Sequence, residues 1–166
     1  MTYRFFNPVP KTVEELKSMF RKLAFTHHPD RGGNVEDMKT VNNEYDELFA
    51  RLKDTHAAAD GTAYTAKEST AETAADFRDI IEKLIHIPEI NIELCGRWLW
   101  ISGNTYAARE ELKAAGCRYA SKKRMWYWHF EEDGTDRPHK AVSMDRIREL
   151  YGSEEIAHTA ARTAIA

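Results

Sequence analysis

Apolar and polar positions near the start of the chain repeat with a helical period. One face of the first stretch is apolar, and it is formed by Val13, Leu16, Phe20, Leu23 and Ala24. This spacing predicts a helix that continues to about His27, and Thr12 followed by Glu15 is typical of its N-terminus. Pro29 disfavours helical geometry in the residue before it, so the helix must end near His28.

A second amphipathic stretch follows after a short turn. Gly32 and Gly33 free the backbone to reverse direction, and Asn34 can cap the next helix. The apolar stripe of that helix consists of Met38, Val41, Tyr45, Leu48 and Leu52. Two such helices joined by a short loop predict an antiparallel helical hairpin packed face to face.

The composition changes between about residues 56 and 75, where Ala, Thr, Ser and Glu dominate and Tyr64 is almost the only large apolar residue. We interpret residues 56–75 as a linker, either a flexible tether or a partly helical spacer, because alanines favour a helix while threonines and Gly61 oppose it. A new amphipathic helix is predicted from about Glu72 to Pro88. Its inward side chains are Phe77, Ile80, Ile81, Leu84 and Ile85.

After Pro88 the pattern alternates with a period of two. Residues 91–101 predict a β-hairpin around Cys95-Gly96-Arg97. Residues 117–130 predict a second hairpin, whose polar turn is Ser121-Lys122-Lys123-Arg124.

Two further helices are expected beside these strands. Thr105 can cap a short helix that Gly116 stops, and Ser143 opens a last helix that runs to Tyr151. The sequence thus predicts an α+β fold with an antiparallel sheet covered by helices on one face. Its expected parts are a helical hairpin at 1–55, the linker at 56–75, an α+β domain at 76–152 and a loose tail at 153–166.

Composition and charge narrow the class of protein. The chain has 166 residues, a formal net charge of −3 and 42% hydrophobic residues, which is ordinary for a globular protein. Its start has neither the basic region nor the apolar core of a signal peptide, and no apolar run approaches the length of a membrane span. We therefore expect a cytoplasmic protein without membrane attachment.

Cysteine and histidine spacing indicates no disulfide or metal chemistry. Cys95 and Cys117 stand far apart without a Cys-x-x-Cys motif, so we expect reduced, packed thiols. His27 and His28 are adjacent, whereas two ligands on one helix face need a spacing of about four residues. Neither a pattern of nucleophile, base and orienting residue nor a phosphate-binding glycine loop is present. We expect no cofactor and no enzymatic activity.

The loop between the first two helices has the sequence His28-Pro29-Asp30, followed by Arg31-Gly32-Gly33 and preceded by Arg-Lys-Leu-Ala at residues 21–24. From about Thr12 to Lys53, these residues resemble the J domain of the DnaJ family of co-chaperones. The short loop is more similar to the compact J domains of auxilin and of polyomavirus T antigens. The resemblance implies binding to a DnaK-type ATPase chaperone and stimulation of its ATPase, with Asp30 paired to an arginine of that chaperone.

A basic helix face accompanies this loop. Lys17, Ser18, Arg21 and Lys22 fall on the side away from the apolar stripe, where they can meet an acidic partner or simply form a solvated face. His28 can likewise be a turn residue that caps backbone groups, and the proline after it can be purely structural. The predicted chaperone-binding residues are His28, Pro29, Asp30, Lys17, Arg21, Lys22 and Arg31.

The chain departs from the family pattern in several places. A usual J domain begins with an additional helix, which we expect to be lost because only residues 2–7 precede Pro8. Tyr3, Phe5 and Phe6 are expected to cover the hairpin as an extended segment. A clear final helix, the Gly/Phe-rich segment and the zinc-binding repeats of full DnaJ are also missing. Substrate delivery by the DnaJ route is therefore not predicted.

The C-terminal part is rich in large aromatic residues. Trp98 and Trp100 share one strand face and Trp126 and Trp128 another, which favours a tryptophan-rich core. The alternative is a ligand platform, in which bases stack on the rings while cations meet phosphates, or the same residues hold a protein client. The cations concerned are Arg118, Lys122, Lys123 and Arg124. Residues 116–128 locally resemble an element of phage and mobile-element proteins, which names no activity.

Two functions follow from these observations. In the first, which we favour, the chain is a J-domain co-chaperone whose C-terminal domain binds a client or partner protein. In the second, the helical hairpin is a degenerate scaffold, and the chain is a nucleic-acid-binding accessory protein of a phage or mobile element.

Overall fold

The computed structural model describes residues 2–58, 60–67, 70–95, 98–130, 142–151 and 154–156. The fold is α+β, as the sequence predicted. The described residues form two compact units. The first unit comprises the chain up to Ile81 together with Phe130, and the second comprises Glu82–His129 and the described residues from 142 onward.

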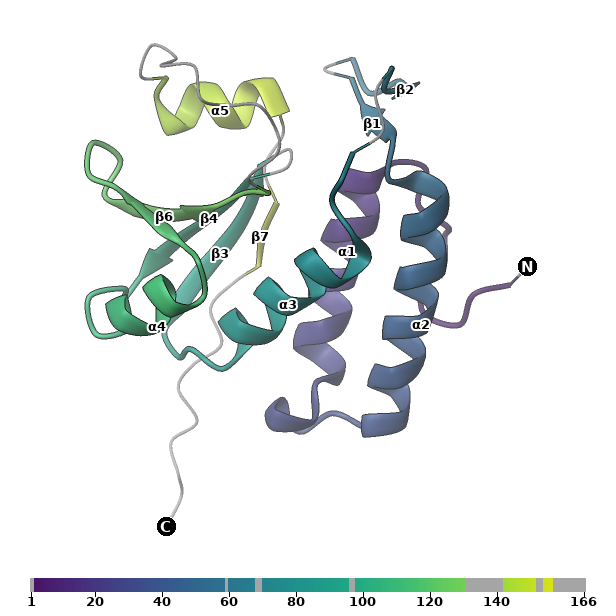
Figure 1. Cartoon of the computed structure of the whole chain (residues 1–166), viewed down its shortest axis with the longest axis horizontal. Coiled ribbons are helices and arrows are strands. Elements are labelled where there is room, and N and C mark those ends of the chain that lie inside the picture. The colour runs from purple at the N-terminus through teal and green to yellow at the C-terminus, as the bar shows by residue number, and fades with distance from the viewer. Residues whose placement is uncertain are drawn as a thin grey trace. The chain divides into compact units, whose positions relative to one another are not determined.

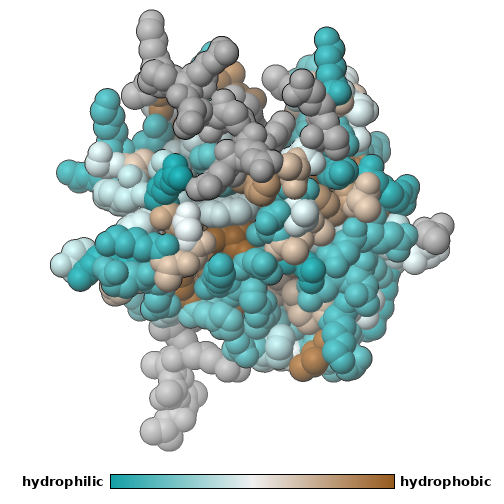
Figure 2. All heavy atoms as spheres, viewed as in Figure 1, coloured by the Kyte–Doolittle hydropathy of each residue, from teal (hydrophilic) through white to brown (hydrophobic). Residues whose placement is uncertain are grey.

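The first unit is built on two antiparallel helices, α1 (Val13–His27) and α2 (Val35–Leu52), joined by a 3-10 turn at Pro29–Arg31 (Figure 1). The predicted hairpin is confirmed. The two apolar stripes meet in its core, where the rings of Phe20 and Tyr45 lie 4.2 Å apart. The side of α2 seen in Figure 2 carries mostly hydrophilic side chains, as an amphipathic helix requires.

The N-terminal segment covers this hairpin without forming a helix. Phe6 is fully buried and Tyr3 is 6% exposed, as expected for an extended cover. The Glu44 carboxylate on α2 accepts hydrogen bonds from the backbone N–H groups of Arg4, Phe5 and Phe6 at 2.7, 3.0 and 3.3 Å. One carboxylate therefore satisfies three backbone donors and fixes the segment along α2.

The described residues of the predicted linker at 56–75 belong to the first unit, which corrects the predicted domain boundaries. Strands β1 (Thr55–Ala57) and β2 (Ala63–Thr65) form an antiparallel ladder there. Glu14 holds β1 to the start of α1, since its carboxylate contacts His56 Nδ1 at 2.8 Å and accepts from the Ala57 N–H at 3.0 Å.

Helix α3 (Ala74–Ile85) also departs from the predicted boundary at residue 76, because its residues up to Ile81 belong to the first unit. Phe77 is fully buried, and its ring lies 6.3 Å from the rings of both Phe20 and Tyr45. The sequence showed the apolar stripe of α3 correctly. It did not show which core that stripe completes, because periodicity carries no information about a distant partner.

The second unit is a five-stranded antiparallel sheet with the order β5-β6-β4-β3-β7. Both predicted hairpins are confirmed as the pairs β3–β4 and β5–β6. The strands are β3 (Ile90–Cys95), β4 (Trp98–Gly103), β5 (Arg118–Ala120), β6 (Met125–Trp128) and β7 (Glu154–Ile156).

Three details of the second unit differ from the prediction. Strand β7 lies in the segment 153–166 that was predicted to be a loose tail, and it pairs with β3. Helix α4 (Arg109–Ala114) begins four residues after Thr105, and no side chain caps it. Helices α4 and α5 (Met144–Tyr151) lie on opposite sides of the sheet in Figure 1 rather than on one face. The other residues of the predicted tail lie outside the described part of the chain.

Both cysteines are free and buried, as expected for packed thiols. Burial raises the pKa of the Cys117 thiol to about 12, so this group is protonated at neutral pH. Among the described helices, none is both long enough and apolar enough to cross a bilayer.

Candidate functional site

The His28-Pro29-Asp30 loop is held by hydrogen bonds that converge on His28. Its Nδ1 atom accepts from the Asp30 N–H at 3.2 Å, and its carbonyl oxygen accepts from the N–H groups of Arg31 at 3.0 Å and Gly33 at 2.9 Å. The His28 residue is 4% exposed. The structure therefore places His28 inside the loop, where it shapes the turn as the structural interpretation of this residue expected.

Asp30, whose Oδ2 atom lies 4.0 Å from His28 Nδ1, is far more exposed than His28. Its side chain is 59% exposed, and Pro29 beside it is also exposed. The Arg31 guanidinium lies 4.9 Å from the centre of the Phe25 ring, which holds this half-buried cation against the end of α1. The loop thus presents an exposed carboxylate on a backbone fixed by His28.

Glycine is required at the two positions of the loop for different structural reasons. Gly32 has a φ of +86°, a left-handed conformation that favours glycine. Gly33 lies against the end of α1, where an added Cβ would stand 2.0 Å from the His27 carbonyl oxygen. The loop can therefore close only where a side chain is absent at residue 33.

The predicted basic face of α1 is wrong for most of its members. Lys17, Ser18 and Arg21 are 2%, 8% and 0% exposed, and only Lys22 is exposed. Lys17 is covered by the chain's own segment at residues 70–77, which the sequence assigned to a linker and a second domain. That segment contributes Glu72 and Phe77 beside Lys17.

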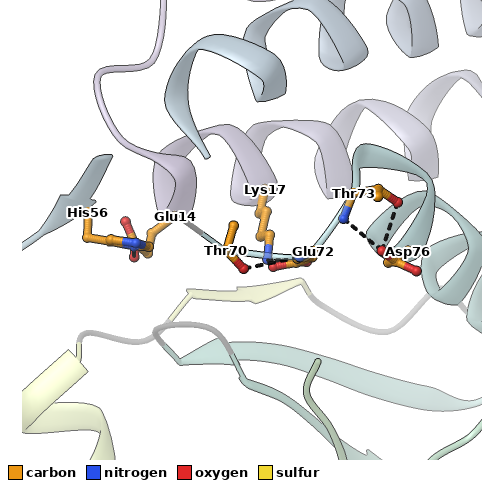
Figure 3. A network of polar contacts seen from close by, with 7 residues as sticks. All are labelled: Glu14, Lys17, His56, Thr70, Glu72, Thr73 and Asp76. Carbon is orange, nitrogen blue, oxygen red and sulfur yellow. Dashed lines mark hydrogen bonds and ion pairs between the residues drawn. The ribbon is translucent and has the colours of Figure 1, made fainter. Parts of the chain in front are cut away.

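Lys17 and Glu72 form a buried ion pair (Figure 3). The Lys17 ammonium donates to both carboxylate oxygens of Glu72 at 2.6 and 2.8 Å, and the two side chains are 2% and 5% exposed. The same ammonium lies 5.0 Å from the centre of the Phe77 ring. Two charges removed from water are tolerated here because each is paired and hydrogen-bonded.

The backbone around Glu72 is fixed by short polar contacts. The Glu72 N–H donates to Thr70 Oγ1 at 3.2 Å, and the Asp76 carboxylate accepts from both the N–H and the hydroxyl of Thr73 at 2.7 Å (Figure 3). Burial, and next the nearby charge of Glu72, raise the pKa of Tyr45 well above its usual value. Sequence reasoning missed Glu72 because nothing in an Ala- and Thr-rich stretch marks a buried carboxylate.

The register of the sheet separates the four tryptophans onto two faces. Trp100 pairs with Tyr127, and Ile101 pairs with Trp126, so neighbouring pairs point to opposite sides. Trp98 and Trp100 share a face with Tyr127, whereas Trp126 and Trp128 lie on the face with Leu99 and Ile101. Trp100 and Trp126 are 4% and 7% exposed, and Trp98 and Trp128 are half-buried. The four side chains therefore do not form one platform.

The cations of the predicted platform lie around the β5–β6 turn. Arg118, Lys122 and Arg124 are exposed, and the half-buried Lys123 has its ammonium 5.7 Å from the centre of the Trp100 ring. Arg118 pairs with Tyr127 in the ladder and therefore shares the face of Trp98 and Trp100.

Comparison with known proteins gives short local matches. The chain is 46% identical over 48 residues to the chaperone protein DnaJ of Caulobacter vibrioides, covering 28% of this chain and 12% of that protein. It is 39% identical over 41 residues to the small t antigen of Budgerigar fledgling disease virus, covering 25% and 28%. It is 45% identical over 42 residues to the chaperone protein dnaJ A6 of Oryza sativa subsp. japonica, covering 24% and 10%.

These matches support a J-domain relationship for about a quarter of the chain. The matched stretch spans less than a third of the length of each of these relatives. No family model matches the chain, and no solved structure matches it.

Proposed function

We propose that this protein is a cytoplasmic J-domain co-chaperone that binds a DnaK-type ATPase chaperone and stimulates its ATPase, and that it is not itself an enzyme. The observation that carries the proposal is the exposed Asp30 carboxylate on a loop fixed by His28 between two packed helices. The second unit would then bind the client or partner protein.

The chemistry of docking follows from which groups are exposed. The Asp30 carboxylate can accept charge-assisted hydrogen bonds from a cation of the chaperone, and such bonds are about twice as strong as neutral ones. Lys22 is exposed on α1 and can meet an acidic group of the same partner. Charges of this kind act mainly on encounter rate and orientation, so docking should weaken as salt is added.

Lys17 and Arg21 enter this proposal differently from the sequence-based expectation. Both are buried, and the Lys17 ammonium is bound by Glu72. A chaperone could reach Lys17 only after the segment that carries Glu72 left α1. We therefore assign first contact to the loop and Lys22, which are exposed without any rearrangement.

The test is the rate of ATP hydrolysis by a purified DnaK-type chaperone with and without this protein. Losing a hydrogen bond to a charged group costs about 1.5–3 kcal/mol, so Asp30→Asn should weaken half-maximal stimulation roughly tenfold or more. Asp79→Asn is the matched control, because it removes an exposed carboxylate from α3 in the same unit. Equal stimulation by the Asp30→Asn variant, or none by the unaltered protein, would overturn the proposal.

A further inference from the structure

One face of the sheet in the second unit carries four neighbouring aromatic rings. We call Trp98, Trp100, Tyr127 and His129 the aromatic row. The Trp98 ring lies 5.8 Å from Trp100, 5.3 Å from Tyr127 and 4.2 Å from His129, and all three pairs are stacked within 28° of parallel. Trp98 is therefore the centre of the aromatic row, and its neighbours fix the plane of its ring.

One ring of the aromatic row is buried, and the other three are partly exposed to solvent. Trp100 is 4% exposed, whereas Trp98, Tyr127 and His129 are half-buried. Aromatic rings with a purely structural role would not need to be exposed to solvent. The opposite face of the same sheet already supplies an apolar core. That core includes Ile92, Leu99, Ile101 and Trp126.

Cations are concentrated in the chain segment that forms one side of the aromatic row. Four cations and no carboxylate occur from Arg118 to His129, in a chain whose formal net charge is −3. Lys123 contacts the Trp100 ring, and Arg118 shares the face of the row. The acidic residue of this face on β3 is Glu93, and Arg148 of α5 binds its two carboxylate oxygens at 2.7 and 2.9 Å.

From this combination we propose that the aromatic row and the β5–β6 turn form a binding surface for single-stranded nucleic acid. Planar rings stack on bases without regard to sequence, and neighbouring cations neutralise the phosphates. A duplex is a poorer occupant because its base faces are already stacked. An acidic peptide matches the cations but offers no planar groups for Trp98 and Tyr127. The surface excludes Trp126 and Trp128, which lie on the opposite face of the sheet.

The experiment uses the full chain and labelled single-stranded oligonucleotides of thymidine or uridine, with binding followed by fluorescence anisotropy. Trp98→Leu should weaken binding at least fivefold, since loss of one stacked base costs roughly 5- to 150-fold. Trp128→Leu is the matched control, because it removes a half-buried tryptophan from the opposite face of the same sheet. Comparison of the DNA and RNA oligonucleotides shows which of the two nucleic acids the surface prefers.

A second variant tests how much the positive charge of the β5–β6 turn contributes to binding. Lys122→Ala with Lys123→Ala should reduce the slope of log affinity against log salt by roughly 0.7 for each phosphate that the turn no longer neutralises. Arg109→Ala with Lys113→Ala is its control, because both cations are exposed on α4. This pair keeps the proposal testable if Trp98→Leu fails to fold, as near-ultraviolet circular dichroism would show.

Three results would overturn the proposal. The first is that neither oligonucleotide binds in a salt-dependent way. The second is that the Trp98→Leu protein binds as tightly as the unaltered protein. The third is that a duplex or a poly-glutamate peptide binds as tightly as the single-stranded oligonucleotides. The assay contains no chaperone, so its outcome is independent of the co-chaperone function proposed above.

Discussion

At the scale of single residues, the tightest steric requirement in the candidate site is at Gly33. A Cβ there would stand 2.0 Å from the His27 carbonyl oxygen and 2.1 Å from its carbon, so the backbone itself would have to move. We expect Gly33→Ala to lower the free energy of unfolding by about 1–3 kcal/mol, as overpacking does. It should also weaken chaperone stimulation, since moving this backbone moves Asp30.

The control for this prediction is Gly61→Ala. Gly61 has a φ of +83° but nothing within 4 Å of its added Cβ, so that variant bears only the conformational cost. Urea denaturation of the two variants separates steric from conformational effects. A Gly33→Ala protein as stable as the unaltered one would show that the loop relaxes freely.

At the scale of elements, the Lys17–Glu72 pair joins α1 to a segment 55 residues away in the sequence. We expect Glu72→Gln to lower the free energy of unfolding by about 3–5 kcal/mol, because breaking a buried pair leaves an uncompensated charge. Replacing both partners, Lys17→Met with Glu72→Leu, should recover most of that loss. Denaturant midpoints of the single and double variants are the measurement, and a double variant no better than the single would contradict this explanation.

The loop as an element was predictable because its signals are local. Pro29 ends α1, Asn34 caps α2 by accepting from the Glu36 N–H at 2.8 Å, and Gly32 adopts the left-handed backbone. Which residue of the loop is buried and which is exposed was not predictable. His28 and Asp30 are both polar residues, so the sequence does not distinguish them. Only the fold buries His28 and exposes Asp30.

At the scale of the whole molecule, the boundary between the compact units lies within α3 rather than in the predicted linker at residues 56–75. We expect a fragment of residues 1–81 to unfold cooperatively and a fragment of residues 1–55 not to do so. The shorter fragment lacks Glu72 and Phe77 and leaves Lys17, Phe20 and Tyr45 uncovered. Thermal unfolding followed by circular dichroism tests this, and equal cooperativity of the two fragments would show that the hairpin needs no cover.

The sequence alone determined those elements whose signals lie within a few residues of one another. These are the helices α1 and α2 with their loop, the apolar stripe of α3 and the two β-hairpins of the sheet. Helical and strand periods, caps and turn residues act over one or two turns of chain, so a single sequence reveals them.

Only the tertiary structure decided which surfaces those elements leave open. It buried Lys17 and Arg21, placed Glu72 of a segment that resembled a linker against Lys17, added β7 to the sheet, and placed the four tryptophans on two faces. Glu93 and Arg148, like Lys17 and Glu72, meet across 55 residues. Contacts between residues so far apart depend on the packing of the whole unit, and they leave no periodic trace in the sequence.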